Sequence, residues 1–149
     1  MAIIYISDIL SLIISHAPLF RIRPSKRNRI RDNGLIHFTD MAFYESICQN
    51  GLLGAYSNMG KFEESLGKLV WTYPYKNEND IEVKHKKMLK KKKGTENPKS
   101  FGICIRITGI SEDDLNRLYT RYGYIMDGAI VYRGEKLNPE NIELIKQWD

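Results

Sequence analysis

The segment Leu35-Ile36-His37-Phe38-Thr39-Asp40 predicts a β-strand that carries two polar side chains on one face. Alternate residues of a strand point to opposite faces, so His37 and Thr39 lie on one side and Ile36 and Phe38 on the other. The apolar side suits a hydrophobic core. The polar side leaves an imidazole and a hydroxyl, two residues apart, to line a cleft.

A helix and a second strand follow this segment. Thr39 or Asp40 can cap the helix, and Asn50-Gly51 ends it. The second strand is Leu69-Val70-Trp71-Thr72-Tyr73, in which the two aromatic rings share one face. Alternate aromatic residues are common in cores and cross-strand pairs, so these rings have a structural explanation as well as a functional one.

The rest of the chain predicts short helices around a central group of strands. We expect a helix over 2–16, a basic connector over 21–33, a lysine-rich surface insertion over 76–99, a strand over 101–108, a short helix after Ser111, one or two strands within 124–132, and a last helix capped by Asn138. The expected fold class is therefore α+β, a single domain with a split, mostly antiparallel sheet flanked by short helices, plus an N-terminal helix. Residues 1–31 would form that helix and the basic connector, and 32–149 the domain.

Composition and cysteine content indicate a single domain in a reducing environment without a metal site. The chain has 149 residues and a formal net charge of +5, which fits one domain. Cys48 and Cys104 lie far apart and show no metal or disulfide pattern, so a reducing cytoplasmic location is expected. The three histidines have no ligand spacing either, and we expect no metal site.

The first twenty residues are rich in Ile and Leu, but polar residues interrupt them. No apolar run reaches the length of a membrane span, and no positive charge precedes the segment as in a signal peptide. A helix that packs on the domain or on a partner is the first interpretation. The alternative is a peripheral membrane helix backed by the basic run Arg21–Arg31.

Two basic runs, Arg21–Arg31 and Lys84–Lys93, flank the two candidate strands in sequence. Such runs are often solvated surfaces. The alternative is contact with a polyanion, either nucleic acid or an anionic membrane. Few aromatic residues lie within them, which favours phosphate contact over base stacking.

The ordered motifs resemble the ADP-ribosyltransferase-like superfamily, in the small toxin or effector type of enzyme. The matching elements are the His-x-Thr strand with His37 and Thr39, the Ile-x-x-x-Gly-Leu element over Ile47–Leu52, the second-strand motif over Val70–Tyr73, and the closing strand and turn within Ala129–Ile142. Together they span roughly residues 35–145. The resemblance implies a split antiparallel sheet and NAD as substrate.

The same resemblance implies roles for particular side chains. His37 and Thr39 would hold NAD, and the ring of Trp71 or Tyr73 would pack against nicotinamide. A carboxylate on a late strand would stabilise the positive charge that develops on the ribose when the glycosidic bond breaks.

Two acids are candidates for this catalytic role. Asp127, which precedes a predicted strand, is preferred to Glu135, which lies in a predicted turn. No Glu-x-Glu pair lies in this region, which does not fit an arginine-modifying transferase. Arg31 and Lys68 are candidates for pairing with the pyrophosphate.

Three functions from different classes follow. The first is an NAD-dependent ADP-ribosyltransferase that modifies a macromolecular acceptor, protein or nucleic acid. The second is a nucleic-acid enzyme or binder, such as a ribonuclease toxin or an RNA 2′-phosphotransferase-like protein. A ribonuclease would need a second general acid or base beside His37, and His85 is a poor candidate. The third is a catalytically silent interaction module that docks through the N-terminal helix.

Overall fold

The computed structural model describes residues 19–56, 66–91, 98–121 and 128–148. Within these ranges the strands are β1 (Leu19–Arg21), β2 (Leu35–Thr39), β3 (Leu52–Leu53), β4 (Leu69–Pro74), β5 (Ile103–Thr108), β6 (Leu118–Arg121), β7 (Ile130–Arg133), β8 (Lys136–Leu137) and β9 (Asn141–Gln147). The helices are α2 (Pro24–Asn33), α3 (Tyr44–Asn50), α5 (Glu78–Lys91) and α6 (Glu112–Leu115), with short 3₁₀ turns η1 (Met41–Phe43) and η2 (Pro98–Phe101).

Seven of these strands form one sheet in the order β1-β6-β7-β4-β2-β5-β9, and β3 pairs with β8. Each of the strand pairs between named strands is antiparallel. The predicted α+β class with a mostly antiparallel sheet is confirmed for the described part of the chain.

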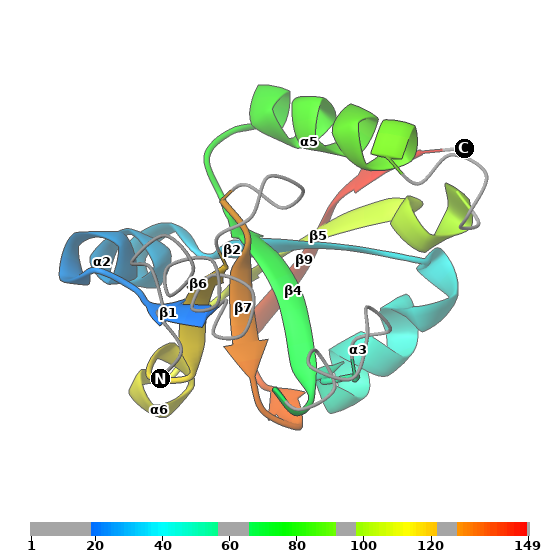
Figure 1. Ribbon diagram of the computed structural model, residues 1–149. Coiled ribbons are helices and arrows are strands. Elements are labelled where there is room, and N and C mark those ends of the chain that lie inside the picture. Colours follow the sequence, from blue (N-terminus) through cyan, green and yellow to red (C-terminus); the bar gives the residue numbers. More distant parts are fainter. Residues whose placement is uncertain (1–18, 57–65, 92–97, 122–127, 149) are drawn as a thin grey trace, which may run out of the picture.

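The sheet divides between β2 and β4. β2 pairs with β5 from Leu35 to Thr39, but it meets β4 only at Leu35↔Pro74 and Ile36↔Tyr73. The rest of β4 pairs with β7 instead. Figure 1 shows the consequence: β2 and β5 run across the view, whereas β4 and β7 run down it. The two half-sheets therefore diverge from a short junction, which is the predicted split.

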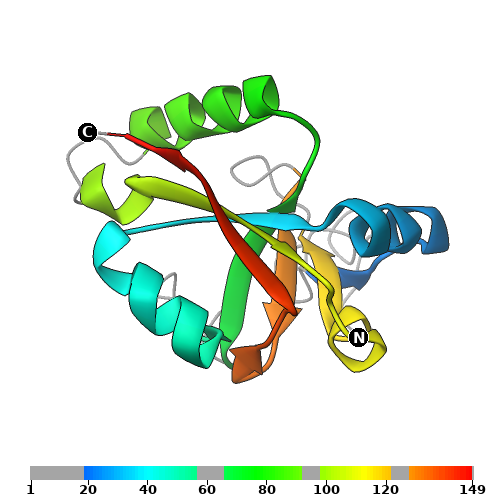
Figure 2. The ribbon, with the colours of Figure 1, turned by 180° about the vertical axis from the view of Figure 1, so that it is seen from behind.

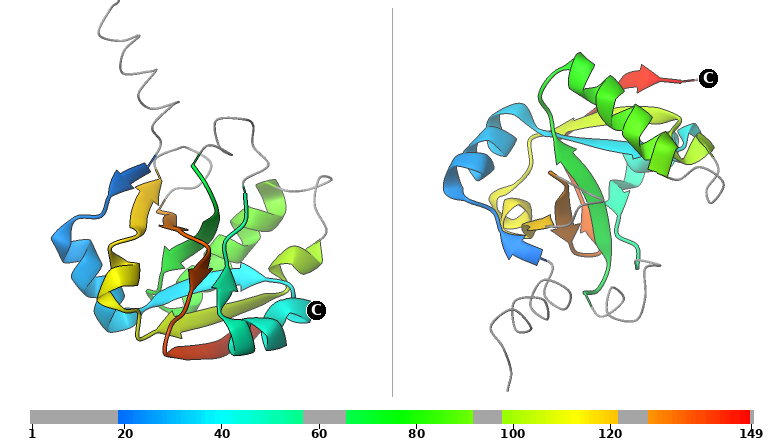
Figure 3. Two further views of the ribbon diagram at one scale, coloured as in Figure 1. Left: turned by 90° about the horizontal axis from the view of Figure 1, so that it is seen from below. Right: turned by 45° about the horizontal axis from the view of Figure 1, so that its top comes forward.

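Alternation within the strands creates two buried faces. The largest apolar cluster lies on one face. Both half-sheets contribute to it, for example through Ile105 on β5 and Ile130 on β7, and it also includes Ile47 of α3. The other face carries Phe38 and Tyr73 and is covered by α5. Figure 2 shows the sheet from behind, with β9 crossing it, and Figure 3 shows α5 lying over β5 and β9.

The segment 76–99 is part of the fold and not only a surface insertion. Its residues 78–91 form α5, whose Ile81 is 2% exposed and packs in the same cluster as Phe38 and Tyr73. His85 is also buried, and Met88 packs against the same cluster. These three positions recur at intervals of four and three, so they share one helix face, and the lysines occupy the others.

Two further expectations are wrong. The connector expected over 21–33 contains α2, because Pro24 occupies the first turn, where its missing N–H costs nothing. The last helix expected after Asn138 is the strand β9, in which Ile142 pairs with Ile107 and Leu144 with Ile105. Cross-strand apolar pairing at the open edge of β5 outweighs the local helix-start signal.

The helix expected over 2–16 lies outside the described residues. Among the residues that are described, no helix is long and apolar enough to cross a membrane.

Candidate functional site

His37 lies where β2 and β4 separate. Its Nδ1 is 2.7 Å from the carbonyl oxygen of Trp71. Trp71 precedes Tyr73 by two residues, and β4 pairs with β2 only at Tyr73 and Pro74. The side chain thus bridges the two strands just after their backbone ladder ends.

This contact determines the tautomer of the ring. A carbonyl oxygen only accepts hydrogen bonds, so Nδ1 carries the hydrogen and donates it. Burial lowers the pKa of His37, although the hydrogen bond to Trp71 opposes this. A neutral ring with hydrogen on Nδ1 has an unprotonated Nε2, which is a hydrogen-bond acceptor. No residue in the described ranges bonds to this nitrogen.

Thr39 ends the same strand two residues later and lies on the same face as His37. Both side chains are half-buried, whereas the flanking Ile36 and Phe38 are buried on the other side. The predicted alternation of His37 and Thr39 with Ile36 and Phe38 is therefore confirmed, but the face of His37 also carries Leu35, which belongs to the largest apolar cluster. Asp40, rather than Thr39, caps the next turn, since its Oδ1 accepts from the backbone N–H of Ala42.

Thr72 is the residue of the second strand that shares the face of His37. It is fully buried, and its Oγ1 donates to the carbonyl oxygen of Ile130 at 2.7 Å. The hydroxyl therefore links β4 to β7 within the half-sheet, beside the point where β4 leaves β2. This residue was not among the predicted site residues, because the face that it occupies depends on the register between β2 and β4.

Trp71 and Tyr73 do not line the face that carries His37, contrary to the expectation that both would lie in one cleft with it. Tyr73 is buried and meets Phe38 edge to face, with ring centroids 6.2 Å apart. The ammonium of Lys84 on α5 lies 5.4 Å from the Tyr73 ring centroid. The Trp71 ring packs against the clusters on this same face. Trp71 contributes its backbone carbonyl to His37, and its ring supports the core.

The structure describes only one of the two predicted catalytic acids. Asp127 lies outside the described residues. Glu135 lies in the turn between β7 and β8, with its side chain 87% exposed and its Oε1 3.9 Å from Nζ of Lys68. Lys68 precedes Trp71 by three residues, which is about 10 Å along a strand. The described chain therefore does not bring Glu135 to His37.

The two basic runs are partly engaged in contacts within the chain. Arg27 and Arg31 on α2 both bind the Glu112 carboxylate of α6, each at 2.8 Å. Arg31 is therefore not available for a pyrophosphate in this arrangement. In the second run, Lys84 pairs with Asp80 at 2.7 Å. Lys86, Lys87 and Lys90 are exposed, and Lys92 and Lys93 lie outside the described residues.

Neither a metal centre nor a cysteine nucleophile is supported by the described residues. They contain no group of three or more His, Cys, Asp or Glu side chains that could hold a metal ion. Cys104 is fully buried, and burial raises the pKa of its thiol to about 12. A thiol with such a pKa is protonated at neutral pH and is a poor nucleophile.

His85 is a core residue on the far side of the sheet from His37. Its ring stacks on that of Trp148, with centroids 3.6 Å apart and planes 4° apart, and also on Phe38. Its Nε2 donates to the carbonyl oxygen of Phe101 at 3.0 Å. The structure thus separates the two described histidines.

Comparison of the chain with protein-family models, with curated proteins and with solved structures finds no match.

Proposed function

We propose that this protein is an NAD-dependent ADP-ribosyltransferase in which His37 and Thr39 hold NAD at the split between the half-sheets. The observation that carries the proposal is the 2.7 Å hydrogen bond from His37 Nδ1 to the Trp71 carbonyl oxygen. It orients the ring and directs the acceptor nitrogen Nε2 away from the backbone that it bridges. A fixed acceptor is suited to the hydroxyl of a ribose.

Thr39 supplies a second polar group on the same face, next to the opening of the sheet. A hydroxyl can donate and accept, so it can pair with either a ribose hydroxyl or a carboxamide. The cross-strand partners of His37 and Thr39 on this face, Ile105 and Ile103, are fully buried and hold β2 against β5. Support of this kind favours precise placement of a substrate.

The reaction breaks the bond between ribose C1′ and the nicotinamide nitrogen, and nicotinamide leaves with the bonding electrons. The acceptor's nucleophilic atom forms a new bond to C1′, and its proton passes to a base or to water. Positive charge develops on the ribose in between, and a carboxylate stabilises it. We assign this carboxylate to Asp127, because Glu135 is exposed and pairs with Lys68.

The burial of Tyr73 does not fit the nicotinamide contact that the resemblance implies for its ring. A ring that is 8% exposed beneath α5 does not stack on nicotinamide on the other face of the sheet. Thr72 lies on the appropriate face and holds β7 against β4. We therefore assign to Thr72 the role of positioning the two strands that border the site.

The separation of His37 from His85 favours this proposal over a ribonuclease that uses two histidines. General acid–base cleavage of RNA requires two proton-transfer groups on the same side of the reacting phosphate. Here the second described histidine is buried in the opposite face, against Trp148 and Phe38.

The proposal is tested by thermal unfolding with NAD and by release of nicotinamide. Millimolar NAD should raise the melting temperature of the wild-type protein, because a ligand that binds only the folded state stabilises it. His37→Ala should abolish this shift, whereas His85→Phe, on the other face, should retain it. An unchanged melting temperature of the wild type with NAD would contradict the proposal.

The acid is tested separately from binding. Asp127→Asn should retain the NAD-induced shift and lose about a hundredfold in nicotinamide release, a change of roughly 3 kcal/mol in transition-state stabilisation. Glu135→Gln should have little effect on either measurement. The opposite pattern would move the catalytic role to Glu135, and full activity in both variants would exclude this mechanism.

A further inference from the structure

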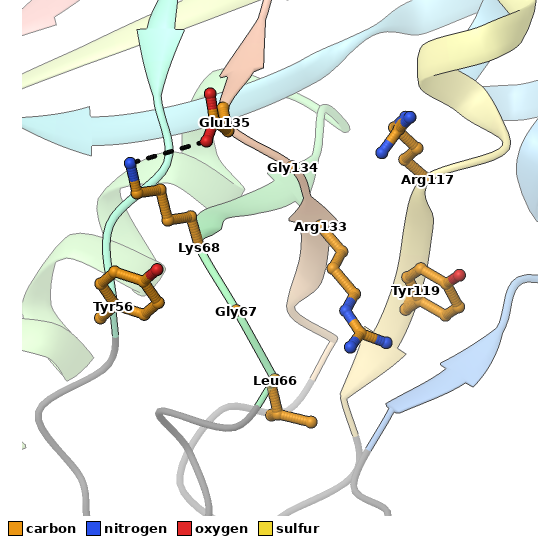
Figure 4. A pocket seen from close by; sticks show the side chains of 9 residues that line it. All are labelled: Tyr56, Leu66, Gly67, Lys68, Arg117, Tyr119, Arg133, Gly134 and Glu135. Atoms are coloured by element: carbon orange, nitrogen blue, oxygen red, sulfur yellow. Dashed lines mark ion pairs between the residues drawn. The ribbon is translucent and has the colours of Figure 1, made fainter.

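A polar pocket lies at the end of the half-sheet that contains β4, β6 and β7, away from His37. It is an open hollow of about 430 Å³, lined by residues that come from these strands and their connections: Tyr56, Leu66, Gly67, Lys68, Arg117, Tyr119, Arg133, Gly134 and Glu135. Figure 4 shows Lys68 and Glu135 on one side, Arg117 and Tyr119 on the other, and Arg133 between them.

The charge of this pocket is unbalanced. Three cations line it against one carboxylate, and that carboxylate, Glu135, pairs with Lys68 at 3.9 Å, the outer limit of an ion pair. Among the residues that the structure describes, no carboxylate lies within ion-pair distance of Arg117 or Arg133. Two guanidinium groups that face one pocket without an acidic partner favour an anionic ligand, and phosphate fits their fork of donors.

The backbone around the pocket is tightly constrained. The N–H of Gly134 donates to the carbonyl oxygen of Lys68 at 3.0 Å, and that of Arg133 to the carbonyl oxygen of Arg117 at 2.9 Å. A Cβ on Gly134 would lie only 2.8 Å from the Tyr132 ring, so a side chain there would displace the turn. The three cationic residues are therefore held at fixed backbone positions.

Aromatic side chains complete the pocket. Tyr119 lies on β6 opposite Val131, in the same cross-strand row as Arg21 on β1. Tyr56 lies on the other side, with the Lys68 ammonium 5.9 Å from its ring centroid. A basic groove with flanking aromatic rings is the arrangement by which proteins bind a phosphate together with its base. A pocket of several hundred Å³ accepts a ligand of the size of one nucleotide.

We infer that this pocket binds a nucleotide unit, with its phosphate between Arg117 and Arg133 and its base or sugar against Tyr119. The site is separate from His37. Two sources share this chemistry, a free mononucleotide and one residue of a single-stranded nucleic acid. Arg21, exposed beyond Tyr119 in the same row, offers a next phosphate contact, so a strand should bind more tightly than a mononucleotide.

The test compares adenosine, AMP, inorganic phosphate and a fluorescently labelled ten-nucleotide single strand, with unfolding temperature and fluorescence anisotropy as readouts. AMP should stabilise the protein and adenosine should not, and inorganic phosphate should compete with AMP. The double variant Arg117→Gln, Arg133→Gln should bind both AMP and the strand at least about tenfold more weakly. For the strand, the slope of log affinity against log salt should become about 1.4 less steep.

A matched control removes the same charge elsewhere. Lys86 and Lys87 are exposed on α5, and Lys86→Gln, Lys87→Gln should change strand affinity by less than about twofold. Equal losses in the two double variants would show that only net charge matters and would overturn the site. The double pocket variant should also retain the NAD-induced shift that His37→Ala loses. Loss of the NAD shift in the pocket variant would mean that NAD itself occupies this pocket, which would overturn a separate site.

Discussion

His37 illustrates how one side chain can compensate for a break in a sheet. β4 lies between β7 and β2 in the sheet. At Trp71 it still pairs with β7, but the edge that faces β2 no longer has a strand partner. The imidazole of His37 supplies one hydrogen bond across the gap, at 2.7 Å. The sequence could predict that His37 and Thr39 share a face. It could not predict the contact with Trp71, which depends on the divergence of two strands more than thirty residues apart.

Thr72→Val tests the polar link on the other side of the split. Valine has nearly the same shape but lacks the hydroxyl that donates to the Ile130 carbonyl. Because Thr72 is fully buried, we expect a loss of about 1 kcal/mol in the free energy of unfolding. Urea denaturation measures it. A stability equal to that of wild type would mean that the hydroxyl contributes nothing net.

The two described histidines predict a pH dependence of stability. Burial lowers the pKa of both His37 and His85 in the folded protein, so both bind a proton less readily there than in the unfolded chain. The unfolded chain, with histidine pKa values of about 6.5, binds more protons below that pH. The histidine contribution to stability should therefore be complete above about pH 7.5 and should be lost as the pH falls through about 6.5.

His85→Phe isolates the contribution of one ring. Phenylalanine keeps an aromatic ring against Trp148 but does not titrate. Loss of the bond to Phe101 should lower stability by about 1 kcal/mol at all pH values. The additional loss between about pH 7.5 and 5.5 should be smaller than in wild type, because only His37 still contributes it. Denaturation at a series of pH values measures both effects, and an unchanged pH slope would contradict the assignment.

At the scale of elements, local patterns predicted the strands near the candidate site better than the outer elements. β2 and β4 have strong alternation, and both match the expected ranges to within one residue. α5 was missed as a core element because its buried stripe contains only Ile81, His85 and Met88 among many lysines. β9 was missed because Asn138-Pro139 is also a typical helix start, and only the edge of β5 explains why a strand forms.

α5 should matter to stability despite its charge. Ile81→Ala removes a side chain that is 2% exposed between the helix and the sheet, and we expect a loss of about 3 kcal/mol. Lys86→Ala on the exposed face of the same helix is the control and should change stability by less than about 0.5 kcal/mol. Chemical denaturation measures both. If Ile81→Ala changes the free energy of unfolding as little as the control, α5 does not contribute to the stability of the core.

At the scale of the molecule, the split sheet still has a continuous interior. One apolar cluster includes Ile105 and Ile107 from one half-sheet and Val70 and Ile130 from the other. The backbone connection between the halves is much weaker, only two residue pairs between β2 and β4. The shared core, more than the backbone ladder, therefore holds the two half-sheets together, and it leaves room for the strands to diverge beside His37.

This arrangement predicts cooperative unfolding of the whole described domain. The two tryptophans lie in different halves: Trp71 is on β4, and Trp148 follows β9, where its backbone N–H donates to the Gly102 carbonyl oxygen at 2.8 Å. In the single-tryptophan variants Trp71→Phe and Trp148→Phe, the remaining tryptophan reports on one half. In each variant, the urea midpoint from fluorescence should coincide with that from far-UV circular dichroism, because removal of either half exposes the common core. A midpoint that differs between the two probes would show that one half-sheet unfolds independently, and the shared cluster would then be too weak to couple them.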